Sequence, residues 1–353
     1  MPRKGIIIGF GNMGRVHYDN CQKLKDVEIT AVIDSSDVAV GFAKSVGLSA
    51  YKLLDECKEA SAADFFVICV PTDEHYKYLE IIIKQYKKPI FVEKPAVRTI
   101  EEVRALESLA RDYPFPIFVG EVEHYNPRMS EFLKLHEDPS YLKISRMVNL
   151  PYFLKGAQPW FLEQKRSGGP ALDLMYHDLS CAISIFGTPV LGKVTATQTK
   201  YNCVDEVTAQ FQFQHFNAEI KASWVSEDTD HPIVTIIEVG KRYGAQPLKI
   251  RIDDYLLKDK LLSDDAYYLE LEAFIRAIET NKVEHPLGEY LAVVQIANHI
   301  NDKIQKQQQF ASSSNPISAF QIPVQTNRTA HLTLVKSGTP DEDTKMYVVP
   351  GRG

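Results

Sequence analysis

The feature that most constrains this chain is the stretch KGIIIGFGNMGR at residues 4–15, where a short apolar run ends directly in glycines. The run predicts a buried strand, and Gly9, Gly11 and Gly14 fit the spacing G-x-G-x-x-G. Such glycines permit a tight turn, a close approach of a pyrophosphate and close packing of the following helix, whose N-terminus binds phosphates. An ordinary glycine turn is the alternative. We predict a dinucleotide site made by Gly9, Phe10, Gly11, Asn12, Met13 and Gly14.

The segment VEITAVID at residues 27–34 predicts a second buried strand that ends in Asp34. An acid at this place accepts hydrogen bonds from the adenosine ribose, so Asp34 favours NAD over NADP. NADP stays open as an alternative, because Ser35 and Ser36 are able to solvate a 2′-phosphate. The other interpretation of Asp34 is a helix cap or turn residue.

Apolar strands and amphipathic helices alternate through the first third of the chain, for example ADFFVICVP at 63–71 followed by EHYKYLEIIIKQYKK. This alternation predicts an α/β Rossmann domain over residues 1–122, built on a doubly wound parallel sheet. Ligands bind at the carboxyl ends of such strands. The residues at those ends, predicted to bind the cofactor, are Pro71, Thr72, His75, Glu93 and Lys94.

After about residue 125 the pattern changes to strand-like runs that alternate apolar and polar residues, such as DEVTAQFQFQHF. These runs predict an α+β domain over residues 123–305 with a large, mostly antiparallel open sheet. Helices are predicted for SGGPALDLMYHDLSCAISIFG and for two later segments. Residues 306–353 are predicted to be a C-terminal extension, partly of low complexity.

Charge and cysteine content exclude several function classes. The formal net charge is −6 and the pI is near 6.0, which argues against binding to nucleic acid or to an anionic membrane surface. The five cysteines are scattered and show no zinc-site spacing, so we predict no metal and a reducing, cytoplasmic location. No apolar run is long enough to span a membrane.

Oxidation of a secondary alcohol requires a hydride acceptor, a base for the hydroxyl proton and a cation or donor beside the oxygen. Lys94 follows a strand and precedes Pro95, so its ammonium is predicted to face the nicotinamide, although a surface lysine is the alternative. Asp173 and His177 lie four residues apart and are predicted on one face of a helix. Imidazole exchanges protons near neutral pH, whereas the alternative is a helix pair that satisfies its own polarity.

The segments GFGNMGRVH, PTDEH, EKP and SGGPALDLMYHD, in this order, resemble the Gfo/Idh/MocA oxidoreductases. VGEVEHYNP at 119–127 also resembles a V-G-H-x-E-R-F-N-P stretch of members that act on nucleotide-linked amino sugars at the ring 3-position. The resemblance implies a Rossmann domain that binds NAD and a sheet domain that carries the substrate pocket. It also implies a homodimer or homotetramer formed through the open sheet, and a catalytic set of Lys94, Asp173 and His177.

Five further residues are predicted to contact substrate: His124, Tyr125, Trp160, Arg166 and Tyr176. The resemblance implies that Trp160 packs beside a sugar, although an aromatic side chain there is equally suited to a core. His124 stands where the related members carry arginine. Pro170 and Tyr176 depart from the glycines usual in the family, which makes the substrate harder to name.

The sequence therefore predicts an NAD-dependent oxidoreductase that acts on a secondary alcohol of a sugar, nucleotide sugar or cyclitol. Lys94 and His177 would handle the oxygen and its proton. A catalytically silent, dinucleotide-binding regulator and a reductase of a non-sugar ligand remain as alternatives.

Overall fold

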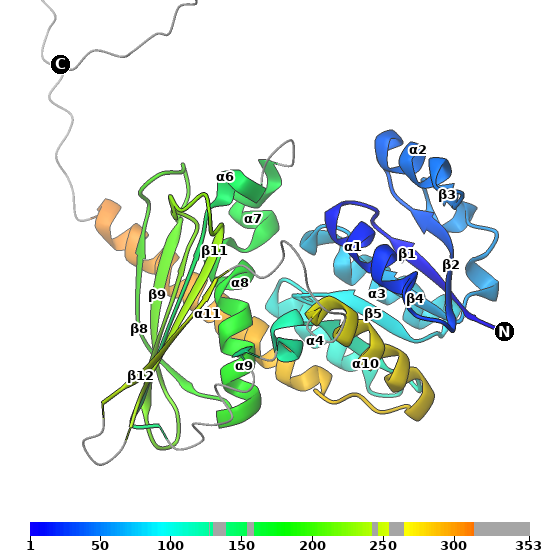
Figure 1. Ribbon diagram of the computed structural model, residues 1–353. Helices are drawn as coiled ribbons and strands as arrows, with labels where there is room; N and C mark the ends of the chain where they lie inside the picture. The colour runs from blue at the N-terminus through cyan, green and yellow to red at the C-terminus, as the bar shows by residue number, and fades with distance from the viewer. Residues whose placement is uncertain (127, 130–138, 154–158, 242–245, 254–264, 314–353) are drawn as a thin grey trace, which may run out of the picture. The chain divides into compact units, whose positions relative to one another are not determined.

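The first sheet has six parallel strands in the order β3-β2-β1-β4-β5-β6 (Figure 1), which confirms the predicted doubly wound sheet. The computed structural model describes residues 1–126, 128–129, 139–153, 159–241, 246–253 and 265–313. The strands of the first sheet are β1 (Arg3–Ile8), β2 (Val27–Ile33), β3 (Ser49–Tyr51), β4 (Phe65–Ile68), β5 (Ile90–Glu93) and β6 (Ile117–Gly120). Every residue of β4 and β6 is buried, because helices cover both faces of the sheet.

The helical segments between these strands follow the predicted pattern. They are α1 (Asn12–Cys21), α2 (Asp37–Ser45), η1 (Leu54–Glu56), η2 (Ala60–Ala62), η3 (Thr72–Glu74), α3 (His75–Ile81), η4 (Ile82–Tyr86) and α4 (Ile100–Ala110). Thr99 caps the N-terminus of α4, because the Thr99 hydroxyl accepts from the Glu102 N–H at 3.2 Å. The Glu102 carboxylate in turn accepts from the Thr99 N–H at 3.1 Å, which completes a capping box.

The second sheet also has six strands, in the order β12-β11-β7-β10-β9-β8. Its strands are β7 (Tyr141–Val148), β8 (Val190–Thr197), β9 (Glu206–Gln212), β10 (Asn217–Ser223), β11 (Ile233–Gly240) and β12 (Leu248–Asp253). Four of its pairings are antiparallel and one, between β7 and β10, is parallel. The prediction of a mostly antiparallel sheet is confirmed. Helices α8 and α9, described next, contact β9 and β10 on one face of this sheet (Figure 1).

The predicted long helix that contains Asp173 and His177 is wrong in one respect, because it is broken into α8 (Gly169–Asp173) and α9 (Met175–Phe186). The break lies at Leu174. The His177 N–H bonds the Leu174 carbonyl at 3.2 Å, so the Asp173 carbonyl is left without the helical partner it would have in a continuous helix. The shorter helical segments of this domain are η5 (Val122–Tyr125), α6 (Leu150–Phe153), η6 (Pro159–Leu162) and α7 (Gln164–Ser167).

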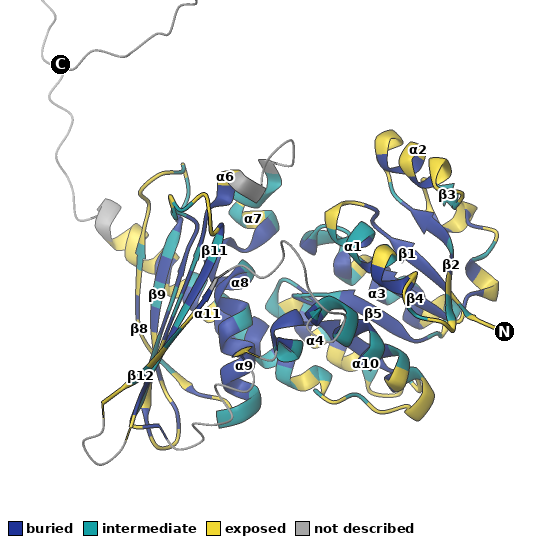
Figure 2. Ribbon diagram, in the orientation of Figure 1, coloured by how far each residue is buried: buried dark blue, intermediate teal, exposed yellow. Residues whose placement is uncertain are grey.

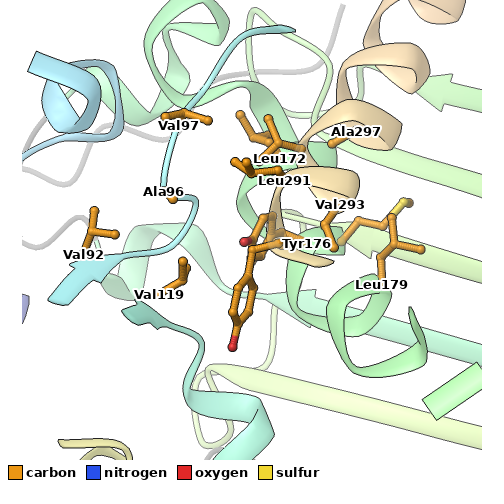
Figure 3. Close-up of a cluster of buried hydrophobic side chains, with 14 of the residues drawn as sticks. Val92, Ala96, Val97, Val119, Leu172, Tyr176, Leu179, Leu291, Val293 and Ala297 are labelled. Carbon is orange, nitrogen blue, oxygen red and sulfur yellow. The ribbon is translucent and has the colours of Figure 1, made fainter. Parts of the chain in front are cut away.

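Two helices late in the sequence complete the two cores. The first, α10 (Ala266–Thr280), packs against α1, and its Phe274 ring contacts Phe65, Phe91 and Phe118 of the first sheet. The second, α11 (Leu287–Ser313), contributes Leu291, Val293 and Ala297 to the cluster in Figure 3. This cluster joins the ends of β5 and β6 to α8 and α9 through Val92, Val119, Leu172 and Leu179. In Figure 2, most of α8 and α9 is coloured as buried.

The boundaries predicted for the two domains, 1–122 and 123–305, stay predictions. The structure groups Met1–Phe310 into one compact unit, and α11 runs past residue 305 to Ser313. Residues 314–353 of the predicted extension lie outside the described residues. Among the helices that the structure describes, none combines the length and apolar character needed to cross a bilayer.

Candidate active site

The glycine turn after β1 has the geometry that a pyrophosphate cradle requires. Gly9 has φ +92°, and a Cβ there would lie 2.5 Å from the Cys69 backbone. A Cβ at Gly14 would lie 2.0 Å from the Gly9 carbonyl oxygen, so α1 approaches the turn as closely as glycine allows. In contrast, a Cβ at Gly11 would meet nothing within 4 Å. The open space at Gly11, next to the N-terminus of α1, fits the phosphates of NAD.

Asp34 lies at the carboxyl end of β2, with its carboxylate fixed by two backbone donors. Its Oδ2 accepts from the Phe10 N–H at 2.7 Å, and its Oδ1 accepts from the Ser36 N–H at 2.8 Å. The first bond ties Asp34 to the glycine turn. Each carboxylate oxygen has a second lone pair, so Asp34 is still able to accept from ribose hydroxyls. These residues fit the adenosine end of a nicotinamide cofactor.

Replacing Asp34 by serine should erode a preference for NAD over NADP. A hydrogen bond to a charged group contributes about 1.5–3 kcal/mol, so we expect roughly 10- to 100-fold weaker NAD binding. NADP binding should weaken less, because the repulsion of its 2′-phosphate is removed. Titration of both cofactors measures this, with Asp26→Ser, in the exposed turn before β2, as the matched control. Tighter binding of NADP than NAD to the parent protein would contradict the assignment.

The polar residues after β4 and β5 are held together by two histidines. His75 Nδ1 and Nε2 lie 2.8 Å from the carbonyl oxygens of Pro95 and Val70, so this ring joins the loops that carry Pro71, Thr72 and Lys94. Burial lowers the pKa of His75, so its neutral ring donates to one of these carbonyls. His17 Nε2 lies 2.5 Å from Glu93 Oε1 and fixes that carboxylate from α1. These contacts connect α1 and the loops after β4 and β5 at the carboxyl edge of the first sheet.

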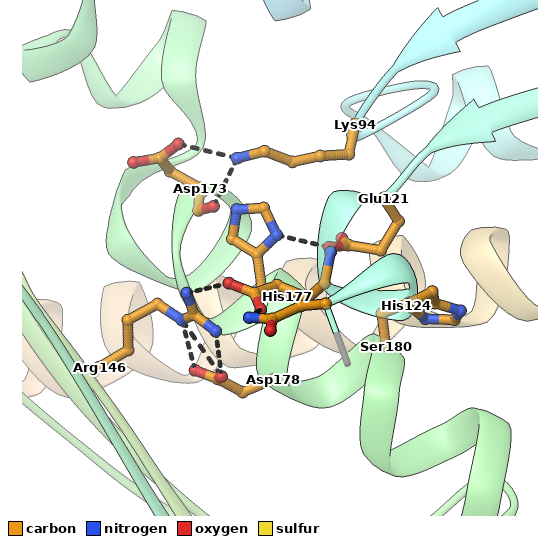
Figure 4. A network of polar contacts seen from close by, with 10 residues as sticks. Lys94, Glu121, His124, Arg146, Asp173, His177, Asp178 and Ser180 are labelled. Carbon is orange, nitrogen blue, oxygen red and sulfur yellow. Dashed lines mark hydrogen bonds and ion pairs between the residues drawn. The ribbon is translucent and has the colours of Figure 1, made fainter. Parts of the chain in front are cut away.

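Lys94 lies directly after β5 and reaches α8 of the other half of the structure. Its Nζ donates to the Asp173 carbonyl at 2.8 Å and lies 3.3 Å from Asp173 Oδ1 (Figure 4). The break at Leu174 makes that carbonyl available. The Trp224 indole N–H donates to Asp173 Oδ2 at 3.1 Å, so both carboxylate oxygens are engaged. The side chain of Lys94 remains 18% exposed, which leaves its ammonium within reach of a ligand.

His177 lies beside Lys94 and is held from behind by a buried acid. Its Nδ1 is 2.6 Å from Glu121 Oε1, and the Glu121 side chain is fully buried (Figure 4). Burial, and then the positive charges of Lys94 and Arg146, lower the pKa of His177 well below its usual value. Burial raises the pKa of Glu121 to about 7, although His124 and Lys94 oppose this shift. The His177 ring is therefore neutral near pH 7, whereas its partner titrates there.

Below this pair lies a buried ion network centred on Arg146. Its Nη1 donates to Glu123 at 2.6 Å, and its Nε and Nη2 donate to Asp178 at 3.1 and 2.8 Å (Figure 4). Asn126 donates a further bond to Glu123 at 2.8 Å. Arg146 is on β7, Glu123 on η5 and Asp178 on α9, so the network fixes the helix that carries His177.

The residues predicted to contact substrate lie in different surroundings. Trp160 and Arg166 form a separate group, in which the guanidinium lies 5.7 Å from the Trp160 ring and donates to Asp73 at 2.7 Å. Tyr125 stacks on Phe118 and belongs to the α10 side of the first sheet. Tyr176 is fully buried in the cluster of Figure 3. His124 Nε2 lies 2.9 Å from the Ser180 hydroxyl. Their roles toward a substrate stay predictions.

Several polar residues that surround Lys94 and His177 are missing from the sequence prediction, namely Glu121, Glu123, Arg146, Asp178 and Trp224. Glu121 carries a usable signal, because it directly follows the buried strand IFVG as Glu93 follows IFV. Arg146 carries a weaker one, since it falls on the apolar side of an alternating strand. Trp224 and Asp178 carry none, because only the tertiary fold brings them to Asp173 and Arg146.

Comparisons with known proteins agree with this geometry. Residues 3–121 match the model of the oxidoreductase family with an NAD-binding Rossmann fold, and residues 139–240 match the GFO/IDH/MocA C-terminal domain. Myo-inositol 2-dehydrogenase of Thermotoga maritima is 28% identical over 188 residues, which are 52% of this chain and 55% of that protein. The chain thus matches about half the length of this relative.

Two longer matches cover most of the chain. The uncharacterized oxidoreductase YrbE of Bacillus subtilis is 26% identical over 78% of this chain and 86% of its own length. The structure of UDP-N-acetylglucosamine 3-dehydrogenase GnnA from Acidithiobacillus ferrooxidans superposes with a TM-score of 0.69 at 21% identity. That match covers 85% of this chain and 97% of the other. The first domain is an NAD-binding Rossmann domain, and the chain belongs to the Gfo/Idh/MocA family of oxidoreductases.

Proposed function

We propose that this oxidoreductase transfers a hydride between NAD and a secondary alcohol of a sugar, nucleotide sugar or cyclitol. The observation that supports this best is the placement of Lys94 and His177, which lie side by side at the carboxyl edge of the first sheet (Figure 4). Each is oriented by an acid, Asp173 for Lys94 and Glu121 for His177. The names of the relatives, inositol and nucleotide-sugar dehydrogenases, agree with this substrate class.

In this proposal Lys94 and His177 divide the work on the reacting oxygen. Bound NAD supplies the acceptor or donor of the hydride. The Lys94 ammonium donates a hydrogen bond to the substrate oxygen and stabilises its negative charge as the hydroxyl loses its proton. His177 is neutral and offers its Nε2 to the same oxygen, so it takes that proton in oxidation and returns it in reduction. Asp173 keeps the ammonium aimed at the site.

Lys94→Ala tests the assignment. Loss of one positioned donor should cut turnover by roughly 10²- to 10³-fold while NAD binding is largely retained. The assay is reduction of NAD with myo-inositol or UDP-N-acetylglucosamine as probes, with cofactor titration in parallel. Lys193→Ala, on an exposed position of β8, is the matched control. Turnover of Lys94→Ala equal to that of the parent would remove Lys94 from the mechanism.

Association and location also remain proposals. The residues of β9 that point away from α8 and α9 are polar and partly or fully exposed, among them Thr208, Gln210 and Gln212. A sheet face of this kind is suited to pairing with a second copy, as a homodimer or homotetramer. Light scattering of the purified protein tests this, and a cytoplasmic location is tested by fractionation.

A further inference from the structure

The buried acids around His177 outnumber the cations that pair with them. Arg146 donates to both Glu123 and Asp178, and each of its three guanidinium nitrogens makes one of these contacts. Glu121 is the third carboxyl group, and no cation pairs with it in the described part of the chain. Its Oε1 lies 2.6 Å from His177 Nδ1 and also accepts from the Glu123 backbone N–H at 3.2 Å. Its Oε2 is buried without a hydrogen-bond partner there. Of the three acids, Glu121 is therefore the one that gains most from taking up a proton.

The pKa shifts of Asp178 and Glu123 also indicate that Glu121 takes up a proton most readily. Burial raises the pKa of Asp178 only to about 6, because Arg146 opposes it. Although burial acts in the same direction on Glu123, Arg146 outweighs it and lowers the pKa of that carboxyl. The charged and titratable groups that face Glu121 are Lys94, Glu123, His124, Tyr176, His177, Asp178, Cys181, Glu270 and Tyr290.

One proton lies in the hydrogen bond between Glu121 and His177. It is attached either to His177 Nδ1 or to the Glu121 carboxyl group. When Glu121 is ionised, His177 Nδ1–H donates to it, and Nε2 carries a lone pair that is able to accept a proton. When Glu121 is protonated, its O–H donates to Nδ1, and Nε2 carries the hydrogen. The protonation of Glu121 thus selects whether His177 faces the site as a base or as an acid.

We propose that Glu121 is a positioning residue that exchanges a proton with His177, so that His177 works as two neutral tautomers and never as an imidazolium. This rests on the proposed function. In oxidation the substrate O–H bond breaks and an Nε2–H bond forms, while the Nδ1–H bond breaks and a Glu121 O–H bond forms. The hydride leaves the same carbon for NAD, and reduction reverses each step. Lys94 and Arg146 make this route favourable, because an imidazolium between them would be repelled by both.

A substrate-free measurement tests the exchange. In protein labelled with ¹⁵N-histidine, the two ring nitrogens of His177 report its tautomer, and the His177→Asn variant identifies its signals among the ten histidines. We expect the Nδ1–H tautomer at alkaline pH and the Nε2–H tautomer at mildly acidic pH. The midpoint should lie near 7, where Glu121 titrates. An imidazolium signal from His177 in this range, or one fixed tautomer throughout, would overturn the proposal even without any variant.

The variant Glu121→Gln tests whether the tautomer switch depends on the titration of the carboxyl group or only on the space that the side chain fills. Glutamine fills the same space and still hydrogen-bonds Nδ1, but it neither takes up nor releases a proton, so the switch near pH 7 should disappear. Glu270→Gln is the matched control, because Glu270 is also buried and burial also raises its pKa, while its carboxyl oxygens have no hydrogen-bond partner in the described part of the chain. That variant should keep the switch. The same switch in Glu121→Gln would assign the titration to another group.

Turnover measurements test the proton exchange and the proposed function independently. With myo-inositol or UDP-N-acetylglucosamine and NAD, oxidation should rise with pH through about 7, and Glu121→Gln should lower it roughly 10²-fold and flatten the profile. An active enzyme whose profile is unchanged in Glu121→Gln would refute the exchange but leave the function intact. A tautomer switch in a protein that turns over neither probe would refute this substrate choice but leave the exchange intact.

Discussion

Replacing His177 by asparagine should lower turnover by roughly 10²- to 10⁴-fold, the usual contribution of a positioned acid–base group. Asparagine has a similar reach and is able to accept a bond from a hydroxyl, but it relays no proton near neutral pH. Glu121 would remain buried behind it with no connection to the substrate. We therefore also expect the rise of the oxidation rate through about pH 7 to vanish, because that rise reports a Glu121–His177 pair.

The pH sign follows from which form each direction needs. Oxidation needs ionised Glu121 and a free Nε2, so its rate rises as pH increases, whereas reduction needs the protonated pair and its rate falls. His215→Asn is the matched control, since His215 is exposed between β9 and β10. Unchanged NAD affinity of His177→Asn would show that its lower turnover does not come from a general loss of structure. An unaltered profile in His177→Asn would move the proton transfer to another residue, and Tyr176→Phe would be the next variant.

Gly11→Val should produce the second large effect, a collapse of NAD binding in a folded protein. Within 4 Å of the new Cβ there are no atoms of the described chain, so the side chain fits the protein but projects into the space for the pyrophosphate. Loss of two hydrogen bonds to phosphate, at about 1.5 kcal/mol each, predicts roughly 100-fold weaker binding. Cofactor titration measures the loss of NAD affinity, and thermal unfolding of the unliganded protein shows whether the variant is still folded.

Variants at two other glycines serve as controls for Gly11→Val, one for loss of stability and one for a neutral substitution. Gly14→Val should destabilise the unliganded protein, because its Cβ would lie 2.0 Å from the Gly9 carbonyl oxygen. Gly288→Val is the neutral control, as it is exposed and its Cβ would also meet nothing within 4 Å. If Gly11→Val bound NAD as tightly as Gly288→Val does, the phosphates would have to lie elsewhere.

The strands and helices whose formation depends on residues close together in the sequence were predicted correctly. The apolar run before Gly9 predicts β1, and the alternation of DEVTAQFQFQHF predicts β9; both strands are present in the structure. Acids and lysines that directly follow buried strands were correctly placed at one edge of the first sheet, because parallel strands end there together.

The parts that depend on distant residues could not. The spacing of Asp173 and His177 predicts a continuous helix, whereas the break at Leu174 turns the Asp173 carbonyl toward Lys94, a contact between residues 79 positions apart. Glu121 and His177 are separated by 56 positions, and Arg146 and Asp178 by 32. Burial of these groups, and hence the direction of their pKa shifts, depends on helices that a local pattern does not locate.

The packing of α10 on the first sheet has a consequence for synthesis of the chain. Phe65, Phe91 and Phe118 leave the ribosome long before Phe274, whose ring contacts all three. A nascent chain that ends at β12 therefore exposes this aromatic surface while the whole second sheet is being translated. The nucleotide-binding half is made first but receives α10 only after the second sheet has been made, so its aromatic surface stays open to aggregation for that whole interval.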